Sequence, residues 1–154
     1  MPMRTRESGF TLVEVLVALV IFAVGLLGIA ALHIESLNAG RTALNRTQAV
    51  ALASDLADRI RANRQACTVG SASCEYESAT GAVTAACETT AGCTPAQLAA
   101  TDIFRWRAIG LAQLPGFDSN VEWTEGTPNT FVITVEWIEP GAGDNNQYEL
   151  RLQI

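Results

Sequence analysis

The feature that most constrains this chain is an unbroken run of 18 residues, Val15 to Leu32, without one polar side chain. A helix rises about 1.5 Å per residue, so this run extends roughly 27 Å, close to the thickness of a bilayer's hydrocarbon core. Arg4 and Arg6 precede the run, and the next basic residue is Arg41. By the positive-inside rule, this distribution places Met1 in the cytoplasm and the chain beyond the run outside.

Two ordinary interpretations of the run remain open. A cleaved secretory signal has a shorter apolar stretch, of about 7–15 residues, followed by small residues. The pair Ala30-Ala31 keeps this interpretation open. An uncleaved signal anchor explains the length, but it leaves Glu14 without a role. A carboxylate near the start of a spanning helix costs on the order of 1–3 kcal/mol unless it is paired or close to the interface, so the simplest account puts Glu14 at headgroup depth.

A third interpretation comes from residues 8–14, which read Ser-Gly-Phe-Thr-Leu-Val-Glu immediately before the apolar run. This pattern resembles the processing site of type IV prepilins and type II secretion pseudopilins. The resemblance implies cleavage between Gly9 and Phe10 by prepilin peptidase on the cytoplasmic face of the membrane. It also implies N-methylation of Phe10, the first residue of the mature chain.

Electrostatics suggests a role for Glu14 beside that resemblance. Cleavage after Gly9 would create an ammonium group on Phe10 at the edge of the hydrocarbon. If subunits are staggered along a filament, Glu14 of one subunit can meet the Phe10 amine of a neighbour. Pairing neutralises two charges together, whereas either one left alone is costly. We therefore expect Glu14 to act in assembly, with headgroup placement as the simpler alternative.

The helix is expected to continue outside the membrane, because no proline occurs between Phe10 and Gln65. Residues 43–66 are dominated by good helix formers. Apolar residues recur at helical spacing and predict a stripe that packs on a globular domain. These residues are Leu37, Leu44, Leu52, Leu56 and Ile60.

Two further features of this helix allow alternatives. Gly25 and Gly28 either mark a point where the helix unwinds in a filament, or they permit close helix packing in the membrane. The basic cluster Arg59-Ile60-Arg61-Ala62-Asn63-Arg64 is interpreted as a solvated helix end, where cations are electrostatically favourable, with a functional basic patch as the alternative.

All four cysteines, Cys67, Cys74, Cys87 and Cys93, lie in a segment rich in Ala, Ser, Thr and Gly, residues 66–94. After a membrane crossing in a Gram-negative cell this segment faces an oxidising compartment, so an even count predicts two disulfides. We favour Cys67–Cys74 and Cys87–Cys93 because each closes a short loop, with the nested Cys67–Cys93 and Cys74–Cys87 arrangement as the alternative. Zinc binding is the rival interpretation of the four cysteines. The spacings C-x6-C and C-x5-C are longer than the usual x2 to x4 of zinc sites and argue against it.

The C-terminal part predicts one helix followed by three strands. Thr94-Pro95-Ala96-Gln97 is a helix start, with Thr as cap and Gln completing a capping box. Leu114-Pro115-Gly116 ends this helix. One of its faces is expected to be buried; it carries Ala99, Ile103, Trp106 and Gly110.

The strands are predicted from strict alternation of apolar and polar residues. They cover residues 121–124, 130–138 and 148–154, with a turn at 126–129 and a polar loop at 140–147. The result is an antiparallel meander packed on the second half of the long helix. Its aromatic side chains are interpreted as core rather than as a ligand platform.

The order of these motifs narrows the resemblance. Residues 93–99 read Cys-Thr-Pro-Ala-Gln-Leu-Ala and are followed by Asp102, Trp106, the Leu-Pro-Gly of 114–116, and a strand ending in Gln153-Ile154. This pattern is similar to the PilV family of minor pilins, the type IV pilus modification proteins. The resemblance implies an α+β, pilin-like fold: a long N-terminal helix, a small antiparallel sheet, an extra helix and a disulfide-bearing loop.

The expected organisation has four parts. A cytoplasmic prepilin leader is followed by a transmembrane and filament-core helix, an amphipathic continuation of that helix, and a periplasmic globular domain. The boundaries are 1–9, 10–33, 34–66 and 67–154.

The function implied by the resemblance is a non-catalytic filament subunit that promotes pilus assembly, priming or formation of a tip complex, in adhesion or motility. The implied partners are prepilin peptidase, other minor and major pilins, the inner-membrane assembly platform and a PilY-type tip adhesin. The protein would sit in the inner membrane and then in the pilus at the cell surface. The alternatives are a type II secretion minor pseudopilin and a membrane-anchored periplasmic binding protein, receptor or enzyme.

Composition argues against several other classes. The formal net charge is −6 and every cation is arginine, without a basic cluster suited to nucleic acid. The single histidine, His33, lies at the membrane end of the helix, so no Cys/His or Ser/His/Asp set can form in the domain. We therefore expect no enzyme activity and no cofactor. Asp144-Asn145-Asn146 could touch calcium, but a solvated loop is the expected outcome.

Overall fold

The computed structural model describes residues 9–67, 74–78, 81–89, 92–126, 128–139 and 145–154. The chain divides into two compact units, one ending at Arg41 and the other running from Thr42 to Ile154. The leader residues 1–8, with Arg4 and Arg6, lie outside the described residues.

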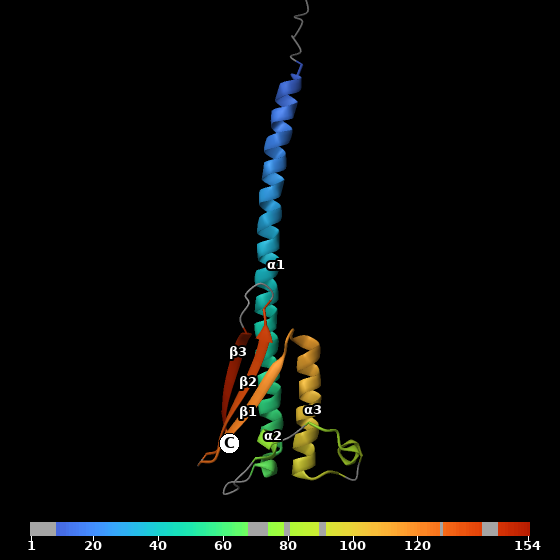
Figure 1. Ribbon diagram of the computed structural model, residues 1–154, viewed down its shortest axis with the longest axis vertical. Helices are drawn as coiled ribbons and strands as arrows, with labels where there is room; N and C mark the ends of the chain where they lie inside the picture. The colour runs from blue at the N-terminus through green and yellow to red at the C-terminus, as the bar shows by residue number, and fades with distance from the viewer. Residues whose placement is uncertain (1–8, 68–73, 79–80, 90–91, 127, 140–144) are drawn as a thin grey trace, which may run out of the picture. The chain divides into compact units, whose positions relative to one another are not determined.

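Helix α1 runs from Leu12 to Ala62 and crosses the boundary between the units (Figure 1). It confirms the predicted long helix and ends close to the expected Gln65, where a 3-10 turn, Arg64–Ala66, follows. The helix is continuous through Gly25 and Gly28 in this single chain. Unwinding in a filament stays a prediction.

Every described residue of the first unit, from Gly9 to Arg41, is exposed. In the second unit, one stripe of α1 is buried: Ala49, Leu52, Ala53, Leu56, Ala57 and Ile60. The predicted stripe is therefore right from Leu52 onward. It is wrong for Leu37 and Leu44, which are 62% and 56% exposed, because neither is covered by another element among the described residues.

The second unit contains a three-stranded antiparallel sheet with the order β1-β2-β3. The strands are β1 (Asp118–Thr124), β2 (Thr130–Ile138) and β3 (Asn145–Gln153), which confirms the predicted meander. Two boundaries differ from prediction. Strand β1 starts earlier, at Asp118, and β3 starts at Asn145, inside the expected polar loop. Backbone pairing of Asn145 with Ile138 sets that start, and it needs no apolar side chain.

The core forms where one face of the sheet meets the second part of α1 and the helix α3 (Pro95–Gln113). On β2 the inward side chains are fully or nearly fully buried, which confirms the core interpretation of the aromatics: Phe131, Ile133, Val135 and Trp137. The strand register places Trp123 of β1 and Leu152 of β3 on either side of Phe131.

Helix α3 begins with the predicted capping box. The Thr94 hydroxyl accepts from the Gln97 amide, and the Gln97 side chain accepts from the Thr94 amide. Its predicted face is buried: Ala99, Ile103, Trp106 and Gly110. The Trp106 indole donates to the Leu52 carbonyl oxygen at 2.8 Å, which joins α3 to α1.

The turn after α3 depends on two glycines. Gly116 has a φ of 63°, a left-handed conformation that favours glycine. A Cβ on Gly110, in the last turns of α3, would overlap the Phe117 ring, so a larger residue there would force that ring to move. The cysteine-bearing region, predicted without regular structure, contains two single-turn elements: helix α2 (Glu75–Ser78) and a 3-10 helix (Ala85–Glu88).

Candidate functional site

The segment around the expected processing site lies at the start of α1. Gly9 and Phe10 precede the helix, and the Phe10 side chain is 82% exposed. The Thr11 hydroxyl accepts from the Glu14 amide at 3.3 Å, so Thr11 caps the helix and satisfies one of its free donors. The peptide bond between Gly9 and Phe10 is therefore outside the helical hydrogen-bond ladder.

Helix α1 is the one helix in the described part of the chain that is long and apolar enough to cross a membrane. Its most apolar window has a mean hydropathy of 3.0 and no buried residue. Large side chains such as Leu19, Phe22 and Leu27 are 58%, 65% and 71% exposed. This surface finds no partner among the described residues and needs lipid or other helices to cover it.

Glu14 stands within this apolar surface. Phe10, Glu14, Ala18 and Phe22 follow one another at i, i+4 spacing and, with Val15 and Leu19, border one shallow hollow. No described side chain forms an ion pair or hydrogen bond with the Glu14 carboxylate. A carboxylate in such surroundings favours a cation that arrives from another molecule.

The structure pairs each cysteine with its neighbour in sequence. Cys67 and Cys74 have Cα atoms 4.5 Å apart, and Cys87 and Cys93 have Cα atoms 4.9 Å apart. Both separations lie in the range of disulfide bonds. The nested pairing that remained open from the sequence is not the arrangement found.

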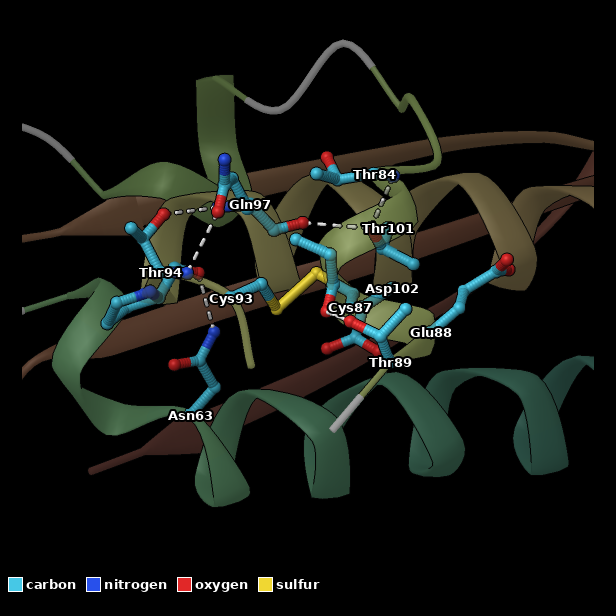
Figure 2. The surroundings of a disulfide bond; sticks show 12 residues. Asn63, Thr84, Cys87, Glu88, Thr89, Cys93, Thr94, Gln97, Thr101 and Asp102 are labelled. Carbon is cyan, nitrogen blue, oxygen red and sulfur yellow. Dashed lines mark hydrogen bonds between the residues drawn. A yellow bond between two sulfur atoms is a disulfide. The ribbon is translucent and has the colours of Figure 1, made fainter. Parts of the chain in front are cut away.

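The 3-10 helix that carries Cys87 lies beside helix α3 (Figure 2). The Thr84 amide donates to the Thr101 hydroxyl at 3.2 Å, and that hydroxyl donates to the Gln97 carbonyl oxygen at 2.9 Å. Glu88 forms an ion pair with Arg105 at 2.6 Å. These contacts hold the 3-10 helix and the residue before it, Thr84, against one side of α3.

A second polar cluster joins the end of α1 to α3 and α2. The Arg59 guanidinium bonds Asp55 through Nε at 3.0 Å and Asp102 through Nη1 at 3.1 Å. The Tyr76 hydroxyl donates to the other oxygen of Asp102 at 2.8 Å. Asn63 donates to the Pro95 carbonyl oxygen at 2.9 Å. We call Asp55, Arg59, Asn63, Tyr76 and Asp102 the junction cluster.

Tyr76 is 1% exposed, and its environment changes its acidity. Burial, reinforced by the hydrogen bond to Asp102, raises the pKa of the Tyr76 phenol above its ordinary value. The phenol is therefore held protonated at any physiological pH and acts as a donor to the carboxylate.

The junction cluster corrects one sequence interpretation. The basic cluster 59–64 was expected to be solvated, and this is wrong for Arg59 and Asn63. Arg59 is partly buried in two ion pairs, and Asn63 is 7% exposed. The i, i+4 spacing of Asp55 and Arg59 was a signal for one of these pairs. The pairs of Asp102 with Arg59 and Tyr76 carried no sequence signal, because they span 43 and 26 residues.

In the described part of the chain, no three His, Cys, Asp or Glu side chains form a group that could hold a metal ion. Asn145 and Asn146, part of the considered calcium loop, lie in strand β3, whereas Asp144 falls outside the described residues.

Two family models match the chain. Residues 4–30 match the prokaryotic N-terminal methylation motif, and residues 31–104 match the family described as type IV pilin Tt1218. The two matches adjoin and support a type IV pilin, a subunit of a pilus or pseudopilus. No curated protein and no solved structure matches the chain significantly.

Proposed function

We propose that this chain is a minor pilin: a non-catalytic filament subunit that promotes assembly, priming or tip-complex formation of a type IV pilus. The observation that carries the proposal is the exposed apolar surface of α1 with Glu14 inside it, directly after a matched methylation motif. A surface of this kind is stable in lipid before assembly and among neighbouring helices after it.

The proposed maturation begins at the cytoplasmic face. Prepilin peptidase cuts between Gly9 and Phe10, and the new amine of Phe10 is methylated. The exposed, non-helical position of Gly9 and Phe10 supports access for a protease. In the filament, the Phe10 amine of one subunit pairs with Glu14 of another, so that neither charge stays alone in an apolar environment.

The proposed organisation keeps the boundaries 1–9, 10–33, 34–66 and 67–154. The first part is the leader, and the second spans the inner membrane with its N-terminus in the cytoplasm. The last part lies in the periplasm, where an oxidising environment favours the two disulfides. The partners are prepilin peptidase, other minor and major pilins, the assembly platform and a PilY-type adhesin.

The finer assignment to the PilV minor pilins rests on the pattern from Cys93 to Gly116. Its capping box, buried Trp106 and terminating Leu114-Pro115-Gly116 form one structural unit on the sheet. Co-purification tests this assignment: pilus subunits support it, whereas secretion-system subunits indicate the pseudopilin alternative.

The first experiment is intact mass and N-terminal sequencing of the membrane-purified protein, from cells with and without prepilin peptidase. We expect a peptidase-dependent start at Phe10, with one methyl group on its amine. A chain that keeps Met1, or one cut beyond Leu32, would overturn the proposal in favour of an anchor or a secreted domain.

The second experiment separates assembly from insertion. Glu14→Ala is expected to leave membrane insertion intact and to reduce incorporation into sheared filaments severely. The matched control is Glu35→Ala, which removes another exposed α1 carboxylate. Normal incorporation of Glu14→Ala, or an equal loss with Glu35→Ala, would contradict the proposed charge pair.

A further inference from the structure

The two cysteine pairs close loops of similar length but lie in different environments. Cys67 and Cys74 belong to the hydrophobic core, with exposures of 4% and 0%. Cys87 and Cys93 are only partly buried, on the outer side of α3. A disulfide inside the core can determine which side chains pack around it, whereas a disulfide at the surface chiefly constrains its own loop.

The Cys67–Cys74 bond connects the end of α1 to α2. Cys67 directly follows the 3-10 turn that ends the α1 region, and Cys74 directly precedes α2. The first turn of α2 is closed by the Glu77 amide, which donates to the Cys74 carbonyl oxygen at 3.1 Å. Helix α2 has four residues, far fewer than an isolated helix needs for stability, so it depends on what holds it from outside.

Helix α2 places Tyr76, two positions after Cys74, in the junction cluster. Its hydroxyl lies at the centre of the junction cluster, 2.8 Å from Asp102 and 3.3 Å from the Arg59 carbonyl oxygen. Asn63 donates to the same hydroxyl at 3.4 Å. One side chain from a dependent helix therefore completes the contact between α1 and α3.

We propose that the Cys67–Cys74 disulfide is an oxidation-controlled latch, which holds Tyr76 in the junction cluster and so fixes α2 against the end of α1 and α3. Reduction by a dithiol breaks the Sγ–Sγ bond; two electrons and two protons pass to the cysteines, which become thiols, while the dithiol becomes a disulfide. Without the bond, α2 loses its tether and Tyr76 leaves Asp102. The latch is independent of the proposed filament function, because it needs only this chain.

The test uses a full-length chain with one tyrosine. The protein has two tyrosines, so Tyr148→Phe leaves Tyr76 as the sole phenol. The Tyr148 hydroxyl makes no hydrogen bond among the described residues, and Tyr148 lies on β3, away from the residues of the junction cluster. Tyrosinate absorbance, followed against pH in detergent micelles, then reports Tyr76 alone.

Two matched pairs of substitutions are compared in this background. Cys67→Ala with Cys74→Ala removes the proposed latch, and Cys87→Ala with Cys93→Ala removes the surface disulfide. In the first variant we expect Tyr76 to ionise at a pH more than about one unit below that of the chain with both disulfides. In the second variant we expect Tyr76 to ionise at the same high pH as in that chain. An unchanged titration in the first variant, or an equal shift in both, overturns the proposal.

Reduction of the chain without cysteine substitutions covers the case in which the first variant fails to fold. On adding dithiothreitol, we expect Tyr76 to ionise at the lower pH while the fluorescence of the three tryptophans stays native. If the tryptophan signal is lost together with the tyrosine signal, the bond supports the whole core and the latch is refuted.

Discussion

Helix α1 carries apolar side chains before and after Thr42, but among the described residues only one stripe of those after it is buried. From Leu12 to Arg41 every residue is exposed, although this is the more apolar part. From Ala49 to Ile60 one stripe is buried against the sheet and α3. The difference shows that apolar content does not by itself make a core; a core also needs facing elements that supply complementary surfaces.

The two parts of α1, before and after Thr42, also differ in what stabilises them. The second part is stabilised by its own domain, through contacts such as the 2.8 Å bond from Trp106 to the Leu52 carbonyl. The first part must be covered by lipid or by other subunits. All three tryptophans, Trp106, Trp123 and Trp137, lie in the second unit, so their fluorescence reports that unit alone.

The largest difference in unfolding free energy is expected between alanine substitutions of two leucines, Leu56 and Leu27. Leu56 is 0% exposed and Leu27 is 71% exposed. Leu56→Ala should lower the free energy of unfolding of the second unit by about 2–5 kcal/mol, through lost burial and the cavity left behind. Leu27→Ala should leave it unchanged. Denaturant unfolding followed by tryptophan fluorescence measures both, and similar values for the two variants would remove the distinction between the parts.

A second contrast uses glycines. Gly110→Ala places a methyl group against the Phe117 ring, and the overpacking should cost about 1–3 kcal/mol. A Cβ on Gly28 would meet nothing within 4 Å in this chain, so Gly28→Ala should leave the tryptophan-detected transition unchanged. Reduced filament incorporation by Gly28→Ala, with normal unfolding, would sharpen the comparison by showing that the first part packs closely only between subunits.

Helix caps offer a smaller contrast. Thr94→Ala removes one half of the capping box of α3 and should cost about 1 kcal/mol in the same unfolding measurement. Thr11→Ala removes the equivalent contact to the Glu14 amide but lies in the first unit. It should not alter the second unit's transition. A loss of stability from Thr11→Ala would mean that the two parts unfold together.

The last contrast concerns Tyr76 and is measured as the dependence of the unfolding free energy on pH in alkali. Because the pKa of Tyr76 is raised in the folded state, folding favours the protonated phenol. The resulting stabilisation is complete below the unfolded pKa, about 10, and is lost as pH rises above it. Tyr76→Phe should therefore flatten the fall in unfolding free energy above about pH 10. An unchanged alkaline slope in that variant would exclude Tyr76 as its source.

Local signals made most of the fold predictable. The long helix, the capping box from Thr94 to Gln97 and the three alternating strands follow from periodicities and turn residues a few positions apart. The errors lie where partners are distant. Leu37 and Leu44 keep helical spacing but stay exposed in the described structure, and the start of β3 depends on pairing with Ile138.

The candidate site divides in the same way. The pattern from Ser8 to Glu14 was readable from adjacent residues, because a short motif and an apolar run are both encoded in contiguous sequence. The junction cluster was not readable, since Arg59, Tyr76 and Asp102 come from three elements that only folding brings together.

By itself, the sequence determined that this chain has an apolar N-terminal helix with a prepilin-like start, an amphipathic continuation and a small antiparallel domain. These properties depend on composition and short-range spacing. Only the tertiary structure decided which part of the helix is buried, which cysteines lie together, and that Tyr76 joins α1 to α3. Those outcomes depend on contacts between distant residues, whose geometry is set by packing of whole elements.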